Sequence, residues 1–339
     1  MKLVTYDTGS GPRCGVLQDD HILDVTALIG HRRSLRDVQA LLELGERSLD
    51  RVREALARRV AAPAVPQHGT RLRSPILRPP TVRDFMVYEE HATAQGTRER
   101  EDAWYRMPIF YFSSPLCIYG PEDHIAYPSA AERLDYELEL GCVIGKEGVN
   151  VPEADGLEYI AGFLIFNDFS ARDLQTDESA VGLGPAKGKD SASSLGPWLV
   201  TTDEMAPYLK NGRLAVKCTS RVNGDFWLSD GDGSQAYHPW ETLVERASRD
   251  SRIVPGDVFG TGTVGGGSCG EAIRKGYDKA RFLLPGDVIE FEVEGLGVLR
   301  NTIDPKALDA STYPYKAKQQ PPLPPRGIAK DYRYELKPH

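Results

Sequence analysis

The chain has 339 residues, of which 40% are hydrophobic and 27% charged, so it is long enough for one large domain and a smaller one. Its 41 lysines and arginines against 49 aspartates and glutamates give a formal net charge of -8, which provides no basic surface for a nucleic-acid backbone. No apolar run approaches the roughly 20 residues of a membrane helix, and the N-terminus lacks the pattern of a signal peptide, so we expect a cytoplasmic protein with neither nucleic acid nor membrane as a partner.

The first 80 residues predict a small β unit followed by a helix. Strand-like runs cover Lys2–Tyr6 and Cys14–Val25, and apolar residues at helical spacing predict one helix that is capped by Ser34 and ends near Val60. The stretch 61–80 then contains five prolines and no periodicity, which is typical of a linker between domains. We therefore predict a small N-terminal domain over 1–75, a larger domain over 76–310 and an extended tail over 311–339.

The larger domain is predicted to be mainly β with short helices, an α+β arrangement. Its expected strands are 109–112, 136–144, 160–166, 214–219, 257–263 and 288–293, and its expected helices are 85–97, 206–209 and 240–249. The five cysteines, which are Cys14, Cys117, Cys142, Cys218 and Cys269, are widely spaced and odd in number. We expect them to be buried free thiols rather than a disulfide framework or a zinc site.

Two glutamates stand out in the predicted strand LDYELELGCVIG. Glu137 and Glu139 are two residues apart, so their side chains point to the same face of the strand, while Leu138 and Leu140 point to the other face. An isolated pair of this kind is usually a solvated edge. Here the apolar flanks predict a buried strand, in which two like charges need a cation or protonation.

Two further acids extend this constellation. The apolar run 163–166 ends at Asn167-Asp168, which places Asp168 at the end of a predicted buried strand. Asp84 lies seven residues before His91, and if it opens a helix the carboxylate and the imidazole project from one side of it. Four carboxylates without a cluster of Cys and His ligands favour a hard divalent cation, Mg²⁺ before Mn²⁺ or Ca²⁺. Such an ion chelates a 1,3-dicarbonyl or a 2-oxo acid and stabilises its enolate, while a histidine activates water.

Five segments in this order resemble the fumarylacetoacetate hydrolase superfamily. They are RDFMVYEEHAT, LDYELELGCVIG, FNDFSARDLQ, LGPAKGKDSASSLGPW and GTGTVGGGSCGE, and the resemblance covers about residues 81–293. It implies a catalytic domain of rolled mixed β-sheets with a small N-terminal accessory domain, and a homodimer. It also implies a small keto acid or diketone as the substrate.

The resemblance implies a role for each matching residue. The metal ligands would be Asp84, Glu137, Glu139 and Asp168. His91 would be the base that activates water, Glu271 would orient it, and Arg172, Gln175 and Lys189 would stabilise developing negative charge. Substrate would be bound by Arg100, Tyr111 and Thr263, and Ser193 would lie beside the metal site. Taken alone, Arg172 could equally form a structural ion pair with Asp173, and Lys189 could be an exposed loop charge.

The predicted reaction is hydrolysis of a carbon–carbon bond in a 1,3-diketone, acylpyruvate or diketo acid. Decarboxylation, isomerisation or dehydration of a 2-oxo acid on the same metal site is the alternative, and a catalytically silent metal-binding protein is disfavoured because no metal or base position is lost. A dinucleotide site is also disfavoured. Gly260, Gly262 and Gly265 match GxGxxG, but Pro285-Gly286 cuts short the helix that such a site needs.

Overall fold

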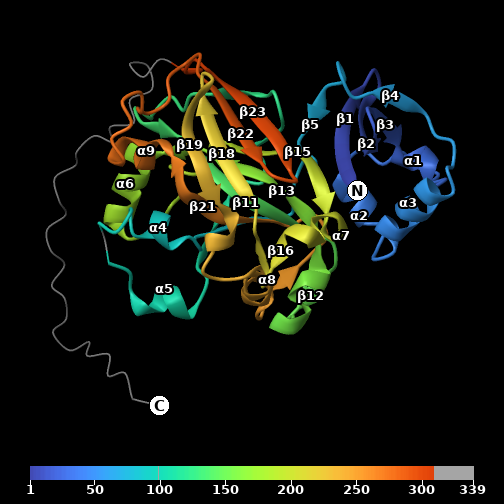
Figure 1. The fold of residues 1–339 in the computed structure, drawn as a ribbon, viewed down its shortest axis with the longest axis horizontal. Helices are drawn as coiled ribbons and strands as arrows, with labels where there is room; N and C mark the ends of the chain where they lie inside the picture. Colours follow the sequence, from blue (N-terminus) through green and yellow to red (C-terminus); the bar gives the residue numbers. More distant parts are fainter. Residues whose placement is uncertain (98, 309–339) are drawn as a thin grey trace, which may run out of the picture.

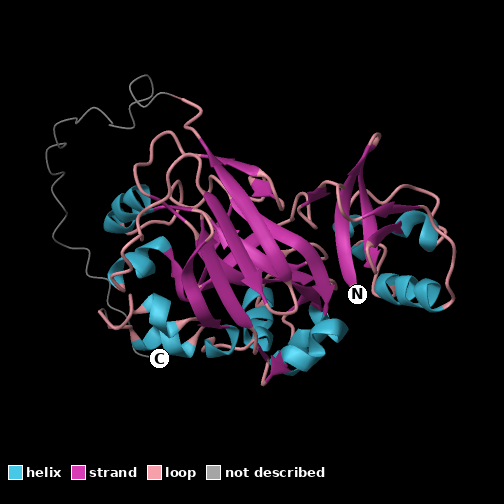
Figure 2. Cartoon of the chain, turned by 45° about the horizontal axis from the view of Figure 1, so that its top comes forward, coloured by secondary structure: helices cyan, strands magenta, loops and turns pink. Residues whose placement is uncertain are grey.

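The computed structural model describes residues 1–97 and 99–308, and within them strands outweigh short helices. This confirms the prediction of a mainly β, α+β fold with mixed sheets. Figure 2 shows the strands crossing the middle of the molecule, with the helices placed around them. The predicted tail over 311–339 lies outside the described residues. None of the described helices combines the length and apolar character needed to cross a bilayer.

The largest sheet has twelve strands, and its path runs β4-β3-β2-β1-β15-β13-β11-β21-β6-β7. The strands of the larger domain in this path are β6 (Val82–Phe85), β7 (Phe110–Ser113), β11 (Glu137–Ile144), β13 (Ile160–Asp168), β15 (Ser193–Thr201) and β21 (Val258–Ser268). Every residue of β11 and β13 is buried, which confirms the buried strand predicted from the apolar residues around Glu137 and Glu139. The two strands pair antiparallel, with Glu139 opposite Phe166.

The N-terminal unit extends this same sheet. Its elements are β1 (Lys2–Thr8), β2 (Gly11–Gln18), β3 (His21–Asp24), β4 (Ala64–Pro66), β5 (Leu72–Arg73), α1 (Val25–Leu28), α2 (Val38–Leu42) and α3 (Ser48–Ala57). β1 joins the larger domain by pairing Lys2 with Val200 and Leu3 with Leu199 of β15. Figure 1 shows this unit at one end of the molecule, in blue, while α4, α6 and α9 gather at the other. The proline-rich stretch contributes β4 and β5, and the division into domains stays a prediction.

The predicted single helix from Ser34 to Val60 is wrong, because the chain forms two shorter helices there. α2 begins after Asp37, whose carboxylate accepts a hydrogen bond from the amide of Ala40 at 2.8 Å. Gly45 then adopts a φ of +101°, which a right-handed helix cannot contain, and α3 starts only at Ser48. The apolar spacing on which the prediction relied continues across this break.

A second sheet of five strands has the order β19-β18-β22-β23-β9 and packs against the main one. Its members are β9 (His124–Ala126), β18 (Lys217–Val222), β19 (Asp225–Asp232), β22 (Val288–Val293) and β23 (Gly297–Asp304). The shorter strands are β8 (Ile118–Tyr119), β10 (Leu134–Asp135), β12 (Gly148–Val149), β14 (Ser170–Ala171), β16 (Leu209–Lys210), β17 (Arg213–Leu214) and β20 (Arg252–Ile253).

The helices of the larger domain are short. They are α4 (Glu89–Ala92), α5 (Asp102–Arg106), α6 (Arg172–Val181), α7 (Thr202–Met205), α8 (Trp240–Ser248) and α9 (Cys269–Arg274), with 3₁₀ helices at Glu153–Tyr159, Ala206–Tyr208 and Gly233–Gln235. Helices are therefore present where residues 206–209 and 240–249 predict them. All five cysteines are free, and four are buried, while Cys117 is partly exposed.

The two faces of the main sheet carry different cores. Leu138 and Leu140 of β11 belong to the large core between the two sheets. Val143 of β11 and Phe166 of β13 belong to a second core on the opposite face, which the N-terminal helices share. Because side chains alternate along a strand, Glu137 and Glu139 face the side of Val143. The acids therefore occupy one end of a face whose other end is filled by the N-terminal unit.

Candidate metal centre and active site

Three of the predicted metal ligands converge from three strands. Asp84 of β6, Glu139 of β11 and Asp168 of β13 each offer a carboxylate oxygen, and these oxygens all lie within 4.8 Å of one another. All three side chains are buried. A cluster of this kind is unstable unless protons or cations offset the repulsion and the lost hydration.

The expectation that Asp84 opens a helix is wrong, because Asp84 lies inside β6, opposite Gly260 of the parallel strand β21. The nearby helix α4 is a single turn over Glu89–Ala92, so the predicted helix over 85–97 is much shorter than expected. Asp84 and His91 reach the same site from a strand and from the helix that follows it, rather than from one helical face. A loop between them makes this convergence possible.

The glycines of the GxGxxG match have a different role from phosphate binding. A Cβ atom on Gly260 would lie 2.7 Å from Asp84 Oδ1, and one on Gly262, which has a φ of +81°, would lie 2.5 Å from the carbonyl oxygen of Phe85. The amide of Gly262 donates hydrogen bonds to Asp84 Oδ1 at 3.2 Å and Glu139 Oε2 at 2.9 Å. These glycines let the backbone of β21 approach and orient two carboxylates. The described residues show no crossover helix after them, only the short α9.

The fourth predicted ligand, Glu137, is engaged by cations of the chain. Arg172 donates to its Oε1 at 2.6 Å, and Lys189 makes a short contact with its Oε2. Lys189 also donates to Asp168 at 2.6 Å. Burial raises the pKa of Glu137, but Arg172 and Lys189 outweigh this effect and hold it well below its usual range. Lys189 is thus a buried cation within the acidic cluster and not an exposed loop charge, and ligation by Glu137 stays a prediction.

Asp135 is a site residue that the sequence reasoning missed. Its buried carboxylate accepts hydrogen bonds from Arg172 Nε at 2.8 Å and from the amides of Cys269 at 2.7 Å and Gly270 at 3.2 Å. Arg172 therefore pairs with Asp135 and Glu137, and not with Asp173. Asp135 ends β10, which pairs with β14 in a separate two-stranded sheet, and it lies outside the predicted strand 136–144 that carries Glu137.

The three converging acids fit a hard divalent cation. Glu139 Oε1 and Asp168 Oδ1 are buried without a hydrogen-bond partner, which leaves two oxygens able to bind an ion. Burial and the neighbouring acids raise the pKa of Glu139 well above its usual range. Burial, opposed by Lys189 and reinforced by Asp84, raises the pKa of Asp168 to about 8. An oxygen-only set of this kind suits Mg²⁺, Mn²⁺ or Ca²⁺.

Metal binding is expected to release protons and to strengthen as pH rises from about 6 to 8. The ligands bind a cation as carboxylates, so an acid with a pKa raised to about 8 has to lose its proton first, and lower pH weakens binding. Titration calorimetry with Mg²⁺ in two buffers of different ionisation enthalpy measures the released protons. An affinity that is flat over this range, with no buffer dependence, would contradict the raised pKa values.

His91 and Glu271 form a pair beside the acids. His91 Nδ1 lies 3.1 Å from Glu271 Oε2, and its Nε2 lies 3.4 Å from Glu137 Oε1. Glu271 lies in the first turn of α9, where Ser268 Oγ donates to its Oε2 at 2.9 Å and the amide of Gly266 donates to its Oε1 at 3.2 Å. Burial lowers the pKa of His91, but Glu271 and Glu137 together raise it to about 9. The carboxylate of Glu271 is therefore fixed by hydrogen bonds and lies at ion-pair distance from the imidazole, although the geometry at Nδ1 is not that of a hydrogen bond.

The remaining predicted residues lie around this centre. The Tyr111 hydroxyl lies within hydrogen-bond distance of both Asp84 Oδ2 and Asp168 Oδ2, so it sits among the metal-site acids and can donate its one hydrogen to either. Thr263 Oγ1 is 3.3 Å from His91 Nε2, and Gln175 Oε1 accepts from Arg172 at 3.0 Å. Ser193 of β15 pairs with Asp168 of β13 in the sheet register, as expected for a residue beside the site.

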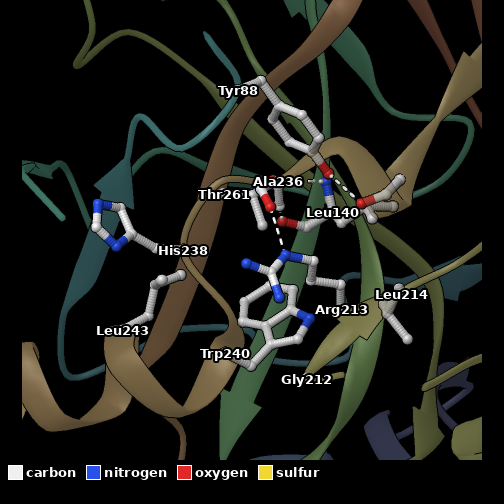
Figure 3. A pocket seen from close by; sticks show the side chains of 11 residues that line it. Tyr88, Leu140, Gly212, Arg213, Leu214, Ala236, His238, Trp240, Leu243 and Thr261 are labelled. Atoms are coloured by element: carbon white, nitrogen blue, oxygen red, sulfur yellow. Dashed lines mark hydrogen bonds between the residues drawn. The ribbon is translucent and has the colours of Figure 1, made fainter. Parts of the chain in front are cut away.

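A cleft of about 620 Å³ opens beside the pair. Its lining includes His91, Arg100, Arg172, Gln175 and Ser268, so predicted catalytic and substrate-binding residues share one cavity. A second cavity, drawn in Figure 3, is lined by Leu140 and Thr261 among others and measures about 10 Å³. That volume corresponds to about one water molecule, so this second cavity belongs to the core and is too small for substrate.

Known proteins with similar sequences and folds point to one family. Residues 81–304 match the family model described as fumarylacetoacetate hydrolase C-terminal. A relative from Xenopus laevis, named mitochondrial oxaloacetate tautomerase, is 32% identical over 310 residues, covering 89% of this chain and 90% of that protein. Because this relative is mitochondrial, the cytoplasmic location expected for the chain stays a prediction.

Two solved structures share the fold over nearly their whole length. One is a 5-carboxymethyl-2-hydroxymuconate delta-isomerase from Mycobacterium smegmatis, with a TM-score of 0.65, 26% identity and coverage of 90% of this chain and 100% of that one. The other is a fumarylacetoacetate hydrolase from Exiguobacterium antarcticum, with a TM-score of 0.69, 27% identity and the same coverage. The motif order, the carboxylate site and these similarities agree: the chain belongs to the fumarylacetoacetate hydrolase family.

Proposed function

We propose that the protein is a divalent-metal-dependent enzyme that interconverts the keto and enol forms of a 2-oxo acid. The observation that carries the proposal is the position of His91, held between Glu271 and Glu137 at the edge of the carboxylate cluster and in the wall of the open cleft. The names of the Xenopus relative, a tautomerase, and of the Mycobacterium structure, an isomerase, support the same type of reaction.

The residues divide the reaction between them. A divalent ion, when bound, polarises the carbonyl oxygen of a substrate and stabilises the negative charge that develops there. Because the pKa of His91 is raised to about 9, its ring is protonated at neutral pH, so Nε2 would give the proton to the carbon beside the carbonyl as the enol becomes the keto form. Glu271 stabilises the charged ring at ion-pair distance, 3.1 Å from Nδ1. Arg172 and Lys189 place positive charge beside the reacting oxygens, and Gln175 positions Arg172 through a 3.0 Å hydrogen bond.

Hydrolysis of a carbon–carbon bond in a 1,3-diketone, acylpyruvate or diketo acid is the second candidate. The observation that favours it is the carboxylate–imidazole pair of Glu271 and His91, since a histidine beside a carboxylate can take a proton from water once the ring is neutral. With the pKa of His91 at about 9, this candidate reaction is expected to speed up as the pH rises towards 9. Mg²⁺ is the ion we propose for either reaction. We also propose a homodimer, because Ile109 and Phe112, next to and within the edge strand β7, are 50% and 62% exposed.

Product analysis distinguishes these reactions. The Mg²⁺-loaded protein is expected to speed the exchange of hydrogen for deuterium at C3 of a 2-oxo acid in D₂O, followed by proton NMR, without breaking the carbon chain. Mass spectrometry on acylpyruvates shows hydrolysis as two fragments that together gain one water, decarboxylation as loss of CO₂ and dehydration as loss of water. Fragmentation without C3 exchange would overturn the tautomerase proposal in favour of hydrolysis.

A further inference from the structure

The chain segment between α6 and β15 carries Lys189 and is held by the helix that precedes it. Glu178 of α6 accepts a hydrogen bond from the backbone amide of Ala186 at 2.8 Å, and the amide of Gly188 lies 3.2 Å from each of its two carboxylate oxygens. The second of these amides belongs to the residue directly before Lys189. One carboxylate therefore fixes the backbone that leads into Lys189.

This segment packs directly on α6. A Cβ atom on Gly188 would lie 2.8 Å from both the backbone nitrogen and the Cβ atom of Gln175, so no larger residue fits between the segment and the helix. Gln175 precedes Glu178 by three residues, which puts the two on adjoining positions of the helix surface. It also accepts a hydrogen bond from Arg172 at 3.0 Å. The side of α6 that orients Arg172 therefore also holds the segment of Lys189.

Ala186 connects Glu178 to Lys189. Its amide binds the carboxylate of Glu178, and its carbonyl oxygen accepts a hydrogen bond from the amide of Lys189 at 3.0 Å. The carbonyl oxygen of Lys189 in turn accepts from Ser113 Oγ at 2.9 Å. The backbone of Lys189 is thus fixed on two sides. Its ammonium group, on a side chain that is only 5% exposed, reaches Asp168 at 2.6 Å.

We propose that Glu178 is a positioning residue, which sets the place of the Lys189 ammonium group by holding residues 186–188 on α6. Glu178 acts through the backbone and not on the substrate, because Thr176 and Ser179 of α6 line the cleft of the proposed active site and Glu178 does not. The contribution of Lys189 to turnover rests on the proposed function, whereas its placement does not. A shift of about 1 Å in such a group costs up to about a hundredfold in rate.

Chemical labelling measures the placement of Lys189 without turnover. Acetic anhydride modifies the accessible lysines of the full chain in Mg²⁺ buffer, and peptide mass spectrometry compares Lys189 with Lys217, an exposed lysine of β18 outside the segment. Glu178→Ala is expected to raise the labelling of Lys189 relative to Lys217 at least about fivefold. The reason is that loss of the hydrogen bonds to two backbone amides lets the segment open about that much more often.

Glu178→Gln is the conservative variant. Oε2 of the glutamate accepts from both amides, and the single oxygen of a glutamine side chain can do the same. We therefore expect the labelling of Lys189 to rise less than about twofold in this variant, because the hydrogen bonds to the segment are kept. Its kcat should stay close to that of wild type.

Turnover shows whether the placement matters. Glu178→Ala is expected to lower kcat for C3 exchange about tenfold to a hundredfold, the loss that follows from a displaced charged group. In a Lys189→Gln background the same change should cost less than about twofold, because a residue that acts through Lys189 then has nothing left to position. A merely structural role of Glu178 would instead lower the melting temperature and reduce kcat by the same factor in both backgrounds.

Asp177→Asn is the matched control, because Asp177 is the neighbouring acid on α6 and is exposed. It is expected to leave labelling and turnover unchanged. Unchanged labelling of Lys189 in Glu178→Ala would overturn the proposal, and so would equal losses of kcat with and without Lys189, or raised labelling with a wild-type kcat. Wild-type protein that catalyses no exchange, with raised labelling of Lys189 in Glu178→Ala, would contradict the proposed reaction only and support the placement by Glu178.

Discussion

Glu139→Gln is expected to abolish binding of Mg²⁺ at the carboxylate cluster and to lower kcat by at least about a thousandfold. Glu139 has one oxygen that accepts from the amide of Gly262 and another that is buried without a partner. An amide keeps the size of the side chain but removes the negative charge that a divalent ion requires. Loss of the ion then removes the polarisation of the substrate carbonyl, which is worth several kcal/mol.

The measurements are metal content by elemental analysis after dialysis and turnover at saturating Mg²⁺. The variant should fold and should melt at a temperature equal to or higher than that of metal-free wild type. The reason is that removing one of several buried like charges relieves their repulsion. Glu158→Gln, the same change at an exposed position, is the control and should retain both ion and activity. Full activity of Glu139→Gln, or of wild type after exhaustive chelation, would exclude the proposed metal centre.

His91→Ala is expected to lower kcat by about a hundredfold to ten-thousandfold, the usual contribution of a positioned acid or base, while Mg²⁺ affinity changes little. The imidazole of His91 contacts Glu271 and Glu137, but His91 does not belong to the group of three carboxylates that could hold the metal ion. A selective effect on turnover would therefore separate proton transfer from metal binding.

Added imidazole provides a further readout for this variant. The alanine leaves a ring-sized space beside Glu271, so free imidazole should restore part of the activity of His91→Ala and leave Glu139→Gln inactive. His124→Ala is the control, because its ring is largely exposed and pairs with Asp304 at 2.7 Å, away from the acids. Wild-type kcat in His91→Ala would exclude the histidine from the reaction.

The strands that carry the site were largely predictable from sequence. Apolar residues flank and follow the two glutamates of β11, and β13 contains a continuous apolar run, so both strands and the common face of Glu137 and Glu139 were predicted. β13 extends to Asp168, two residues past its predicted end. The strand of Asp84 was not predictable in the same way. β6 has four residues, and its partner β21 lies more than 170 residues further along the chain, so no local pattern reports their pairing.

The ion pairs within the site could not be predicted from the sequence either. Lys189 comes from a loop and Arg172 from the start of α6, and only the folded chain shows that both meet Glu137. Spacing along the sequence could not show that Glu137, unlike the other three acids, is paired with both Arg172 and Lys189 and is therefore less available as a metal ligand. Asp135 is a similar case, because it belongs to the two-residue strand β10 and not to the strand of Glu137 and Glu139.

The way β1 joins β15 has a consequence for truncation experiments. Leu199 and Val200 of β15 are paired by β1, and Leu199 shares a core with Leu3 and Val16 of the N-terminal unit. A fragment that starts near residue 76 would present an open strand edge above a bare apolar surface, and such edges recruit other copies of the chain. We expect it to aggregate, so isolating the catalytic region would require a replacement strand and not merely a cut.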